Sequence, residues 1–89
     1  MKVVIVGAGE VGFHIASHLA VENKDVVVVD KDPNALRRVS DSIDVQVVAG
    51  SGGSPLVLQE AGLKEAKMLL AVTDSDETNL VACLVANVV

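Results

Sequence analysis

Gly7-Ala8-Gly9-Glu10-Val11-Gly12 follows directly on the apolar run Val3-Val4-Ile5-Val6, and one helix later a second apolar run ends at Asp30. This succession of strand, G-x-G-x-x-G turn, helix, strand and acid is typical of a βαβ unit that binds a dinucleotide. The glycines alone are weak evidence for such a unit. Here the flanking strands and the spaced acid are present as well, and the pattern predicts an α/β fold with a nucleotide site at this turn.

The three glycines and the acid each have a separate physical task. Gly7 permits the tight turn out of the strand, Gly9 has no Cβ and lets a pyrophosphate approach the backbone, and Gly12 lets the helix lie against the sheet. The N–H groups that open this helix have no partner within it and attract a phosphate. We expect Asp30 to accept hydrogen bonds from the adenosine ribose hydroxyls and to repel a 2′-phosphate, which favours NAD over NADP. The neighbouring Lys31 could act the other way by meeting a 2′-phosphate, or Lys31 and Asp32 could equally form a surface ion pair.

Composition bounds the class of protein. The 89 residues suffice for one small domain or part of a larger one, and the 51% apolar content predicts a packed core and excludes disorder. A net charge of −5 and a single aromatic residue argue against a nucleic-acid partner, which would need a basic footprint or a stacking platform. The single cysteine, Cys83, excludes an internal disulfide. No apolar run is long enough for a membrane span and no signal peptide precedes the first strand, so we expect a soluble, cytoplasmic chain without membrane insertion.

Continuous β-branched runs alternate with helical patterns, which predicts a parallel sheet covered on both faces. The expected strands are residues 2–6, 26–30, 45–49 and 68–72. The first expected helix is 10–22, and the second begins at Asp32-Pro33 and runs through Val39. A short third helix at 56–61 begins after Ser54-Pro55 and ends at Gly62, and the last expected helix is 77–89. On the first helix we expect Val11, Ile15 and Leu19 to face the core and Phe13 to point off that stripe. The fold prediction is a Rossmann-like doubly wound parallel sheet of order 3-2-1-4. A complete domain of this kind would continue with further strands, and we therefore expect residues 1–89 to be the N-terminal, incomplete portion of a larger nucleotide-binding domain.

Polar residues follow the third and fourth strands at the edge where a ligand of such a sheet binds. The crevice lies beyond the carboxyl ends of the first and fourth strands, so Thr73 and Asp74 should face the glycine turn. There Thr73 could donate to or accept from a phosphate or the second ribose, and Asp74 could accept hydrogen bonds from ribose hydroxyls. These residues can equally cap the next helix, and both interpretations can hold together. Gly50-Ser51 would flank the adenine, or form a plain turn.

No catalytic or metal constellation is visible. His14 and His18 have the spacing H-x-x-x-H on one helix, but Ile15 stands where a thermolysin-type motif has glutamate, so we predict a solvated helix face and no metal. Cys83 is best interpreted as a small buried hydrophobe. The sequence has no Ser or Cys with a nearby His and acid, which predicts a protein that is not an enzyme, although a dehydrogenase would keep its catalytic residues beyond this portion.

The chain resembles the N-terminal nucleotide-binding subdomain of the RCK (regulator of potassium conductance) family, also called KTN or the TrkA N-terminal domain. The resemblance covers essentially all 89 residues. Its most discriminating part is the run Thr73-Asp74-Ser75-Asp76-Glu77-Thr78-Asn79 after an apolar strand, which ordinary dehydrogenases do not share. It also rests on residues 4–12, 27–33, 48–51 and 57–62.

The resemblance implies a cytoplasmic regulatory module that controls a potassium transporter or channel. Such modules assemble as homodimers or larger rings beneath a membrane potassium-transporting subunit, and they bind NAD, NADH or adenine nucleotides. Carried over to this chain, the backbone of Gly7, Ala8, Gly9, Glu10 and Val11 would hold the phosphates. Asp30 would bind the adenosine ribose, Ser51 would lie near the adenine, and Thr73 and Asp74 would lie on the far side of the ligand. Many members carry an acid where this chain has Ser51, which affects the expected adenine preference.

Two functions from different classes follow from the sequence. The first is a non-catalytic sensor in which NAD or NADH, or alternatively ATP or ADP, shifts a conformational equilibrium that a potassium transporter senses. The second is the cofactor-binding half of an NAD-dependent oxidoreductase. A structural module with a vestigial nucleotide site is a third interpretation.

Overall fold

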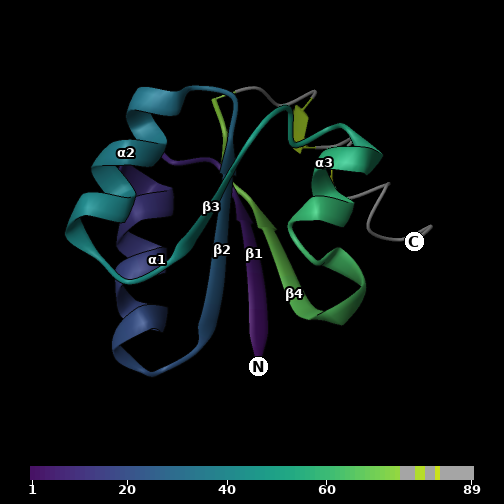
Figure 1. Cartoon of the computed structure of the whole chain (residues 1–89). Helices are drawn as coiled ribbons and strands as arrows, with labels where there is room; N and C mark the ends of the chain where they lie inside the picture. Colours follow the sequence, from purple (N-terminus) through teal and green to yellow (C-terminus); the bar gives the residue numbers. More distant parts are fainter. Residues whose placement is uncertain (75–77, 80–81, 83–89) are drawn as a thin grey trace.

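Four parallel strands form a single sheet in the order β3-β2-β1-β4 (Figure 1). The computed structural model describes residues 1–74, 78–79 and 82. The strands are β1 (Lys2–Val6), β2 (Asp25–Asp30), β3 (Gln46–Ala49) and β4 (Ala66–Ala71). The predicted strand order 3-2-1-4 is confirmed, and because all four strands are parallel their carboxyl ends meet at one edge of the sheet.

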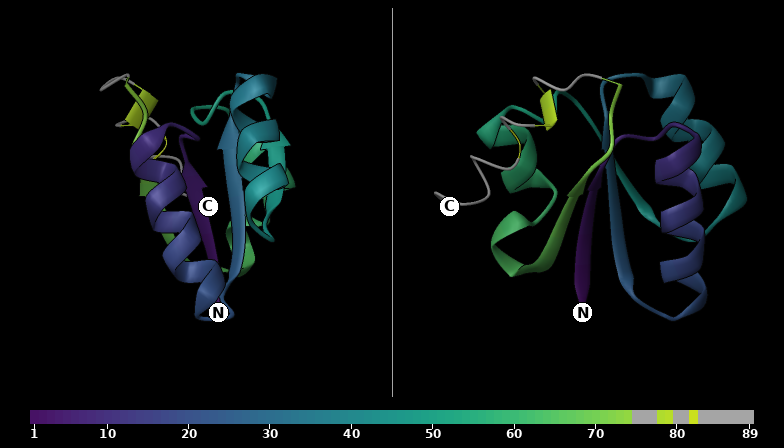
Figure 2. Two further views of the ribbon diagram at one scale, coloured as in Figure 1. Left: turned by 90° about the vertical axis from the view of Figure 1, so that its left-hand side faces the viewer. Right: turned by 180° about the vertical axis from the view of Figure 1, so that it is seen from behind.

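Helices cover both faces of this sheet. The helices are α1 (Glu10–Val21), α2 (Pro33–Ser42), the short α3 (Pro55–Glu60) and the 3-10 turn η1 (Leu63–Glu65). Figures 1 and 2 show α1 and α2 packed on one face and α3 on the opposite face. This arrangement confirms a Rossmann-like α/β fold, in which each crossover helix returns the chain to the start of the next parallel strand.

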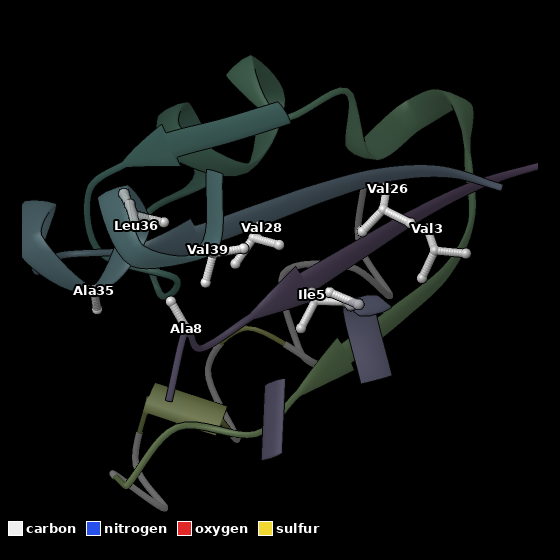
Figure 3. Packing of buried hydrophobic residues seen from close by; sticks show 9 residues of the cluster. Val3, Ile5, Ala8, Val26, Val28, Ala35, Leu36 and Val39 are labelled. Carbon is white, nitrogen blue, oxygen red and sulfur yellow. The ribbon is translucent and has the colours of Figure 1, made fainter. Parts of the chain in front are cut away.

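Side-chain alternation along β1 divides the core between the two faces. Val3 and Ile5 point to the face covered by α1 and α2, where they pack in a cluster with residues of β2 and α2 such as Val28 and Leu36 (Figure 3). Val4 and Val6 point to the other face and pack with Leu58 of α3 in a second cluster. The last four side chains of β1, residues 3–6, are almost fully buried, which is why they form a continuous apolar run and do not alternate with polar residues.

The predicted caps set the starts of α2 and α3. The Asp32 carboxylate accepts a hydrogen bond from Asn34 N–H at 3.0 Å, and the Ser54 hydroxyl accepts a longer one from Val57 N–H at 3.5 Å. Proline follows each cap, where its fixed φ suits the first helical position. Gly62 has φ +82°, the left-handed conformation that ends the α3 segment.

The buried face of α1 agrees with the predicted stripe only in part. Val11 is 59% exposed, whereas the fully buried positions of the helix are Gly12 and Ala16. Phe13, predicted to lie off the core stripe, is partly buried and packs against the core cluster, so that expectation was wrong. Ile15 and Leu19 pack against the same cluster, as predicted. The small residues Gly12 and Ala16 mark the closest approach of α1 to the sheet, so the buried face of the helix is centred on them and excludes Val11.

Strand ends and edges are the other departures from the sequence prediction. β4 begins at Ala66 instead of 68 and is preceded by η1, which was not predicted. The outer strands are only partly covered, and Met68 of β4 is 44% exposed. The predicted last helix at 77–89, with Cys83, lies outside the described residues apart from 78, 79 and 82, of which Ala82 is buried in the second cluster.

Candidate functional site

A cleft of about 560 Å³ opens at the carboxyl ends of the strands. Residues that follow each of the four strands line it, which places the glycine turn, the end of β2, the loop after β3 and the segment after β4 around one space. Seven residues singled out from the sequence lie on its walls: Gly7, Gly9, Asp30, Lys31, Ser51, Thr73 and Asp74.

Three other predicted residues lie outside this cleft. Ala8 and Glu10 line a smaller adjoining cavity of about 390 Å³ between the starts of α1 and the side of α2. Val11 lines neither cavity. A role for these three in phosphate binding was predicted through their backbone N–H groups, and that role stays a prediction.

The start of α1 has unused hydrogen-bond donors at the cleft. Gly9 is its N-cap and supplies no side chain to the first turn, while α2 and α3 are capped by Asp32 and Ser54. A Cβ built on Gly9 would meet nothing within 4 Å. The first turn of α1 is therefore both uncapped and open, and its N–H groups are suited to an anion.

Gly7 and Gly12 are required by the packing of the fold. Gly7 has φ +120°, and a Cβ there would lie 3.0 Å from the carbonyl of Val72. A Cβ on Gly12 would lie 1.9 Å from the carbonyl oxygen of Gly7. Because no side chain fits at either position, the turn and the helix can pack directly on the ends of β1 and β4.

The Asp30 carboxylate accepts hydrogen bonds from two different loops. Ala8 N–H donates to Oδ2 at 2.7 Å, and Asp32 N–H donates to Oδ1 at 2.9 Å. The side chain is half-buried at the end of β2, on the cleft wall. The sequence predicted the place of Asp30 but not these bonds, since nothing in a residue pattern shows which backbone N–H will lie opposite a carboxylate.

Asn79 holds the segment after β4 in place. Its Oδ1 accepts hydrogen bonds from Thr73 N–H at 3.0 Å and from the Thr73 hydroxyl at 2.6 Å, and its Nδ2 donates to the Thr73 carbonyl at 3.1 Å. The hydroxyl proton of Thr73 is therefore directed to Asn79. Asn79 belongs to the run quoted for the family resemblance, but no role for it was predicted.

The loop after β3 approaches the cleft through a buried glycine. A Cβ on Gly52 would lie 2.1 Å from Cγ1 of Val6, so only glycine fits there. Ser51 Oγ accepts a hydrogen bond from Gly53 N–H at 3.2 Å, which stabilises the turn. The sequence analysis placed Gly50-Ser51 beside the adenine or in a plain turn, and it did not identify Gly52 as part of the wall.

Arg38 of α2 is a second cleft residue that the sequence analysis missed. It lines the main cleft and the adjoining cavity, and it lies one turn after Ala35, which also lines the cleft. Arg38 and Lys31 are the cations of the described wall, and its three carboxylates belong to Asp30, Asp32 and Asp74. Because the carboxylates outnumber the cations, backbone N–H groups would supply most of the hydrogen bonds to an anionic ligand.

His14 and His18 lie exposed on α1 and do not line the cleft. A search of residues 1–74, 78–79 and 82 finds no cluster of three potential metal-ligating side chains. Within the same residues, no helix has the length and apolarity that crossing a membrane requires.

Comparison with known proteins gives one family and a consistent set of relatives. The family model of the TrkA-N domain matches residues 3–89. The chain is 49% identical over 87 residues to the Trk system potassium uptake protein TrkA of Halomonas elongata, and 52% identical over 87 residues to that of Azorhizobium caulinodans. Each of these alignments covers 98% of this chain and 19% of the relative. It is 48% identical over 89 residues to a TrkA homolog 1 of Methanosarcina mazei, covering the whole chain and 21% of that relative. The chain thus spans about a fifth of the length of these relatives.

Solved structures support the fold. The Kef CTD of Shewanella denitrificans in its AMP-bound form superposes with a TM-score of 0.83 at 24% identity, covering 98% of this chain and 52% of that one. ChuY, an anaerobilin reductase of Escherichia coli O157:H7, superposes with a TM-score of 0.70 at 20% identity, covering 98% and 45%. At these identities the likeness concerns the fold alone.

Proposed function

The chain belongs to the TrkA-N domain family, and from this premise we propose that it is the nucleotide-sensing module of a potassium uptake system. Its relatives are named as Trk system potassium uptake proteins, of which the chain matches about a fifth. The proposed ligand is NAD or NADH, with ATP or ADP as the alternative. The observation that carries the proposal is the convergence of the uncapped start of α1 and the Asp30 carboxylate on one cleft.

In the proposed complex each wall of the cleft contacts a different part of the ligand. The pyrophosphate lies against the open backbone at Gly9, where no side chain intervenes. Asp30 accepts hydrogen bonds from the adenosine ribose, and Ser51 lies beside the adenine. Thr73 and Asp74 contact the ligand from the side of β4.

The proposed module is not an enzyme. The polar side chains of the described cleft wall are carboxylates, hydroxyls and two cations, and the histidines lie away from it on α1. This wall therefore supplies no histidine to activate a hydroxyl nucleophile. Catalysis by an oxidoreductase would need groups beyond those that line the cleft.

Binding changes transport only if the ligand prefers one conformation of the assembly. A ligand with equal affinity for two states moves no population, whatever its affinity. We therefore propose that the module, in the cytoplasm, forms a homo-oligomer attached to a membrane potassium-transporting subunit. Exchange of one nucleotide for another then shifts the equilibrium of that assembly.

Calorimetric titration of the protein with NAD, NADH, NADP, ATP and ADP tests the proposed ligand. We expect NAD or NADH to bind more tightly than NADP, because a 2′-phosphate meets the Asp30 carboxylate. Asp30→Ala should reduce that difference, and Asp25→Ala, at the opposite end of the same strand, should leave it unchanged. Equal affinity of the unmodified protein for NADP would refute the role of Asp30. Tighter binding of ATP than of NADH would replace the redox signal by one of energy state.

A second measurement tests the link to transport. Potassium uptake in cells that carry Gly9→Ala should lose its response to the nucleotide while the protein remains folded. Turnover of a hydroxy or amino acid with NAD by the intact protein would overturn the non-catalytic assignment.

A further inference from the structure

The Asp30 carboxylate joins two loops that are far apart in the sequence. Ala8 N–H, in the glycine turn, donates to Oδ2 at 2.7 Å across a separation of 22 residues. Asp32 N–H, in the turn after β2, donates to Oδ1 at 2.9 Å. The first bond reaches the turn proposed to hold phosphate, and the second reaches the residue that caps α2.

The bond to Ala8 occurs where the regular backbone pairing of the sheet ends. Gly7 N–H donates to the carbonyl of Val29 at 2.8 Å and prolongs the β1–β2 pairing by one residue. Gly9 is already the N-cap of α1, and its carbonyl accepts from Phe13 N–H at 2.9 Å. Ala8, 5% exposed, lies between these two regular patterns, and its N–H is directed to the Asp30 side chain. The conformation of the turn thus depends on a side chain of β2.

An ionised carboxylate can accept about four hydrogen bonds, roughly two on each oxygen. The backbone N–H groups of Ala8 and Asp32 use one site on each oxygen of Asp30. One site per oxygen is left for the two hydroxyls of a ribose. Loop and ribose can therefore be held at the same time, and ligand binding does not require that the bond to Ala8 break.

We propose that Asp30 is a positioning residue for the phosphate-binding turn in addition to its contact with ribose, an inference that rests on the proposed nucleotide function. Its bond to Ala8 fixes the turn from which the N–H groups at Gly9 and the start of α1 meet the phosphates. Asp30 therefore contributes to the affinity for a nucleotide even when that nucleotide has no ribose hydroxyls.

The test compares ADP, the part that NAD and ATP share, with 2′,3′-dideoxy-ADP, which cannot donate to Asp30. If Asp30 only bound ribose, Asp30→Ala would lower the affinity for ADP and leave that for 2′,3′-dideoxy-ADP unchanged. We expect Asp30→Ala to lower the affinity for 2′,3′-dideoxy-ADP as well, by about fivefold, the factor that one hydrogen bond typically supplies. Asp25→Ala, which removes a carboxylate from the other end of β2, should change neither affinity. An unchanged affinity of Asp30→Ala for the dideoxy nucleotide would overturn the proposal.

Amide hydrogen exchange in the nucleotide-free protein gives a second readout. Asp30→Ala removes both acceptor oxygens, so neither Ala8 N–H nor Asp32 N–H keeps its bond to this side chain. We expect Ala8 N–H to exchange faster in this variant while the amides of β1 keep their protection, and Asp25→Ala to leave Ala8 as it is. Unchanged exchange at Ala8 would refute the positioning role of the hydrogen bond from Ala8 to Asp30. Absence of ADP and NADH binding by the unmodified protein would refute the proposed function. The exchange measurement would still test whether Asp30 fixes the conformation of the glycine turn through Ala8.

Discussion

Gly9→Ala should weaken nucleotide binding and leave the fold intact, whereas Gly12→Ala should destabilise the fold, although each adds one methyl group to the same glycine motif. Gly9 has φ −76° and ψ −164°, which alanine adopts, and its Cβ would meet nothing within 4 Å. Such a substitution stabilises a protein by about 0.4–1 kcal/mol, because it restricts the unfolded chain. We therefore expect Gly9→Ala to unfold at the same temperature as the unmodified protein or slightly above it.

The Cβ of Gly12→Ala would lie 1.9 Å from the Gly7 carbonyl oxygen, about 1.5 Å closer than the 3.4 Å at which ordinary contact begins. The backbone must shift to relieve this contact, at a cost of about 3 kcal/mol for overpacking. Alanine recovers about 1 kcal/mol of helix propensity over glycine. The net loss of about 2 kcal/mol corresponds to a fall in Tm of about 8–16 °C for a domain of this size.

Nucleotide binding should be impaired in Gly9→Ala although its stability is not. The methyl group of Gly9→Ala occupies the space through which a phosphate reaches the backbone, and loss of one charge-assisted hydrogen bond of about 1.5–3 kcal/mol lowers the affinity for ADP roughly tenfold to a hundredfold. Excess ADP should therefore raise the Tm of the unmodified protein by more than that of Gly9→Ala. Calorimetric titration and thermal unfolding measure both quantities on the same samples. Wild-type affinity in Gly9→Ala, or a fall in Tm as large as that of Gly12→Ala, would refute the reasoning.

Three further substitutions test the surrounding structure. Leu58→Ala removes a fully buried side chain from the second cluster and should lower the free energy of unfolding by about 2–5 kcal/mol. Leu56 is 74% exposed on the same helix, so Leu56→Ala should change that free energy by less than about 0.5 kcal/mol. Similar losses for the two variants in urea unfolding would contradict the assigned face of α3. Asp32→Ala removes the cap of α2 and should cost about 1 kcal/mol, with Asp32→Ser recovering part of it, and an unchanged unfolding midpoint would show that the cap contributes nothing. Asn79→Ala removes three hydrogen bonds to Thr73 and should lower the free energy of unfolding by about 1–3 kcal/mol. Asn79→Asp keeps the two bonds accepted by Oδ1 and should lower it by less. Equal losses of stability in the two variants would assign the effect to the bond donated by Nδ2.

The sequence predicted the strand order and most elements because those depend on local patterns. The apolar runs, the caps at Asp32 and Ser54 and the stop at Gly62 each act within a few residues, and the structure has them where they were expected. The carboxyl ends of parallel strands must meet at one edge, so the site residues at those ends could be placed together without coordinates.

The features that the sequence did not predict depend on contacts between segments far apart in the chain. Val11 was assigned to the core by its spacing from Ile15, but the orientation of α1 is set by how closely Gly12 can approach the glycine turn. Likewise, the bond from Ala8 to Asp30 and the fit of Gly52 against Val6 arise only when two loops meet. Single-sequence patterns carry no signal for such pairs.

The glycine turn separates two kinds of constraint that a motif search treats as one. Gly7 and Gly12 are held by the fold itself, because a side chain at either would strike backbone, whereas the space beside Gly9 is empty in the folded chain. Over evolutionary divergence, a member that ceased to bind nucleotide would be free to change the residue at Gly9 while keeping the other two. A side chain at that one position, in an otherwise intact turn, would then mark a domain that has kept its architecture and lost its ligand.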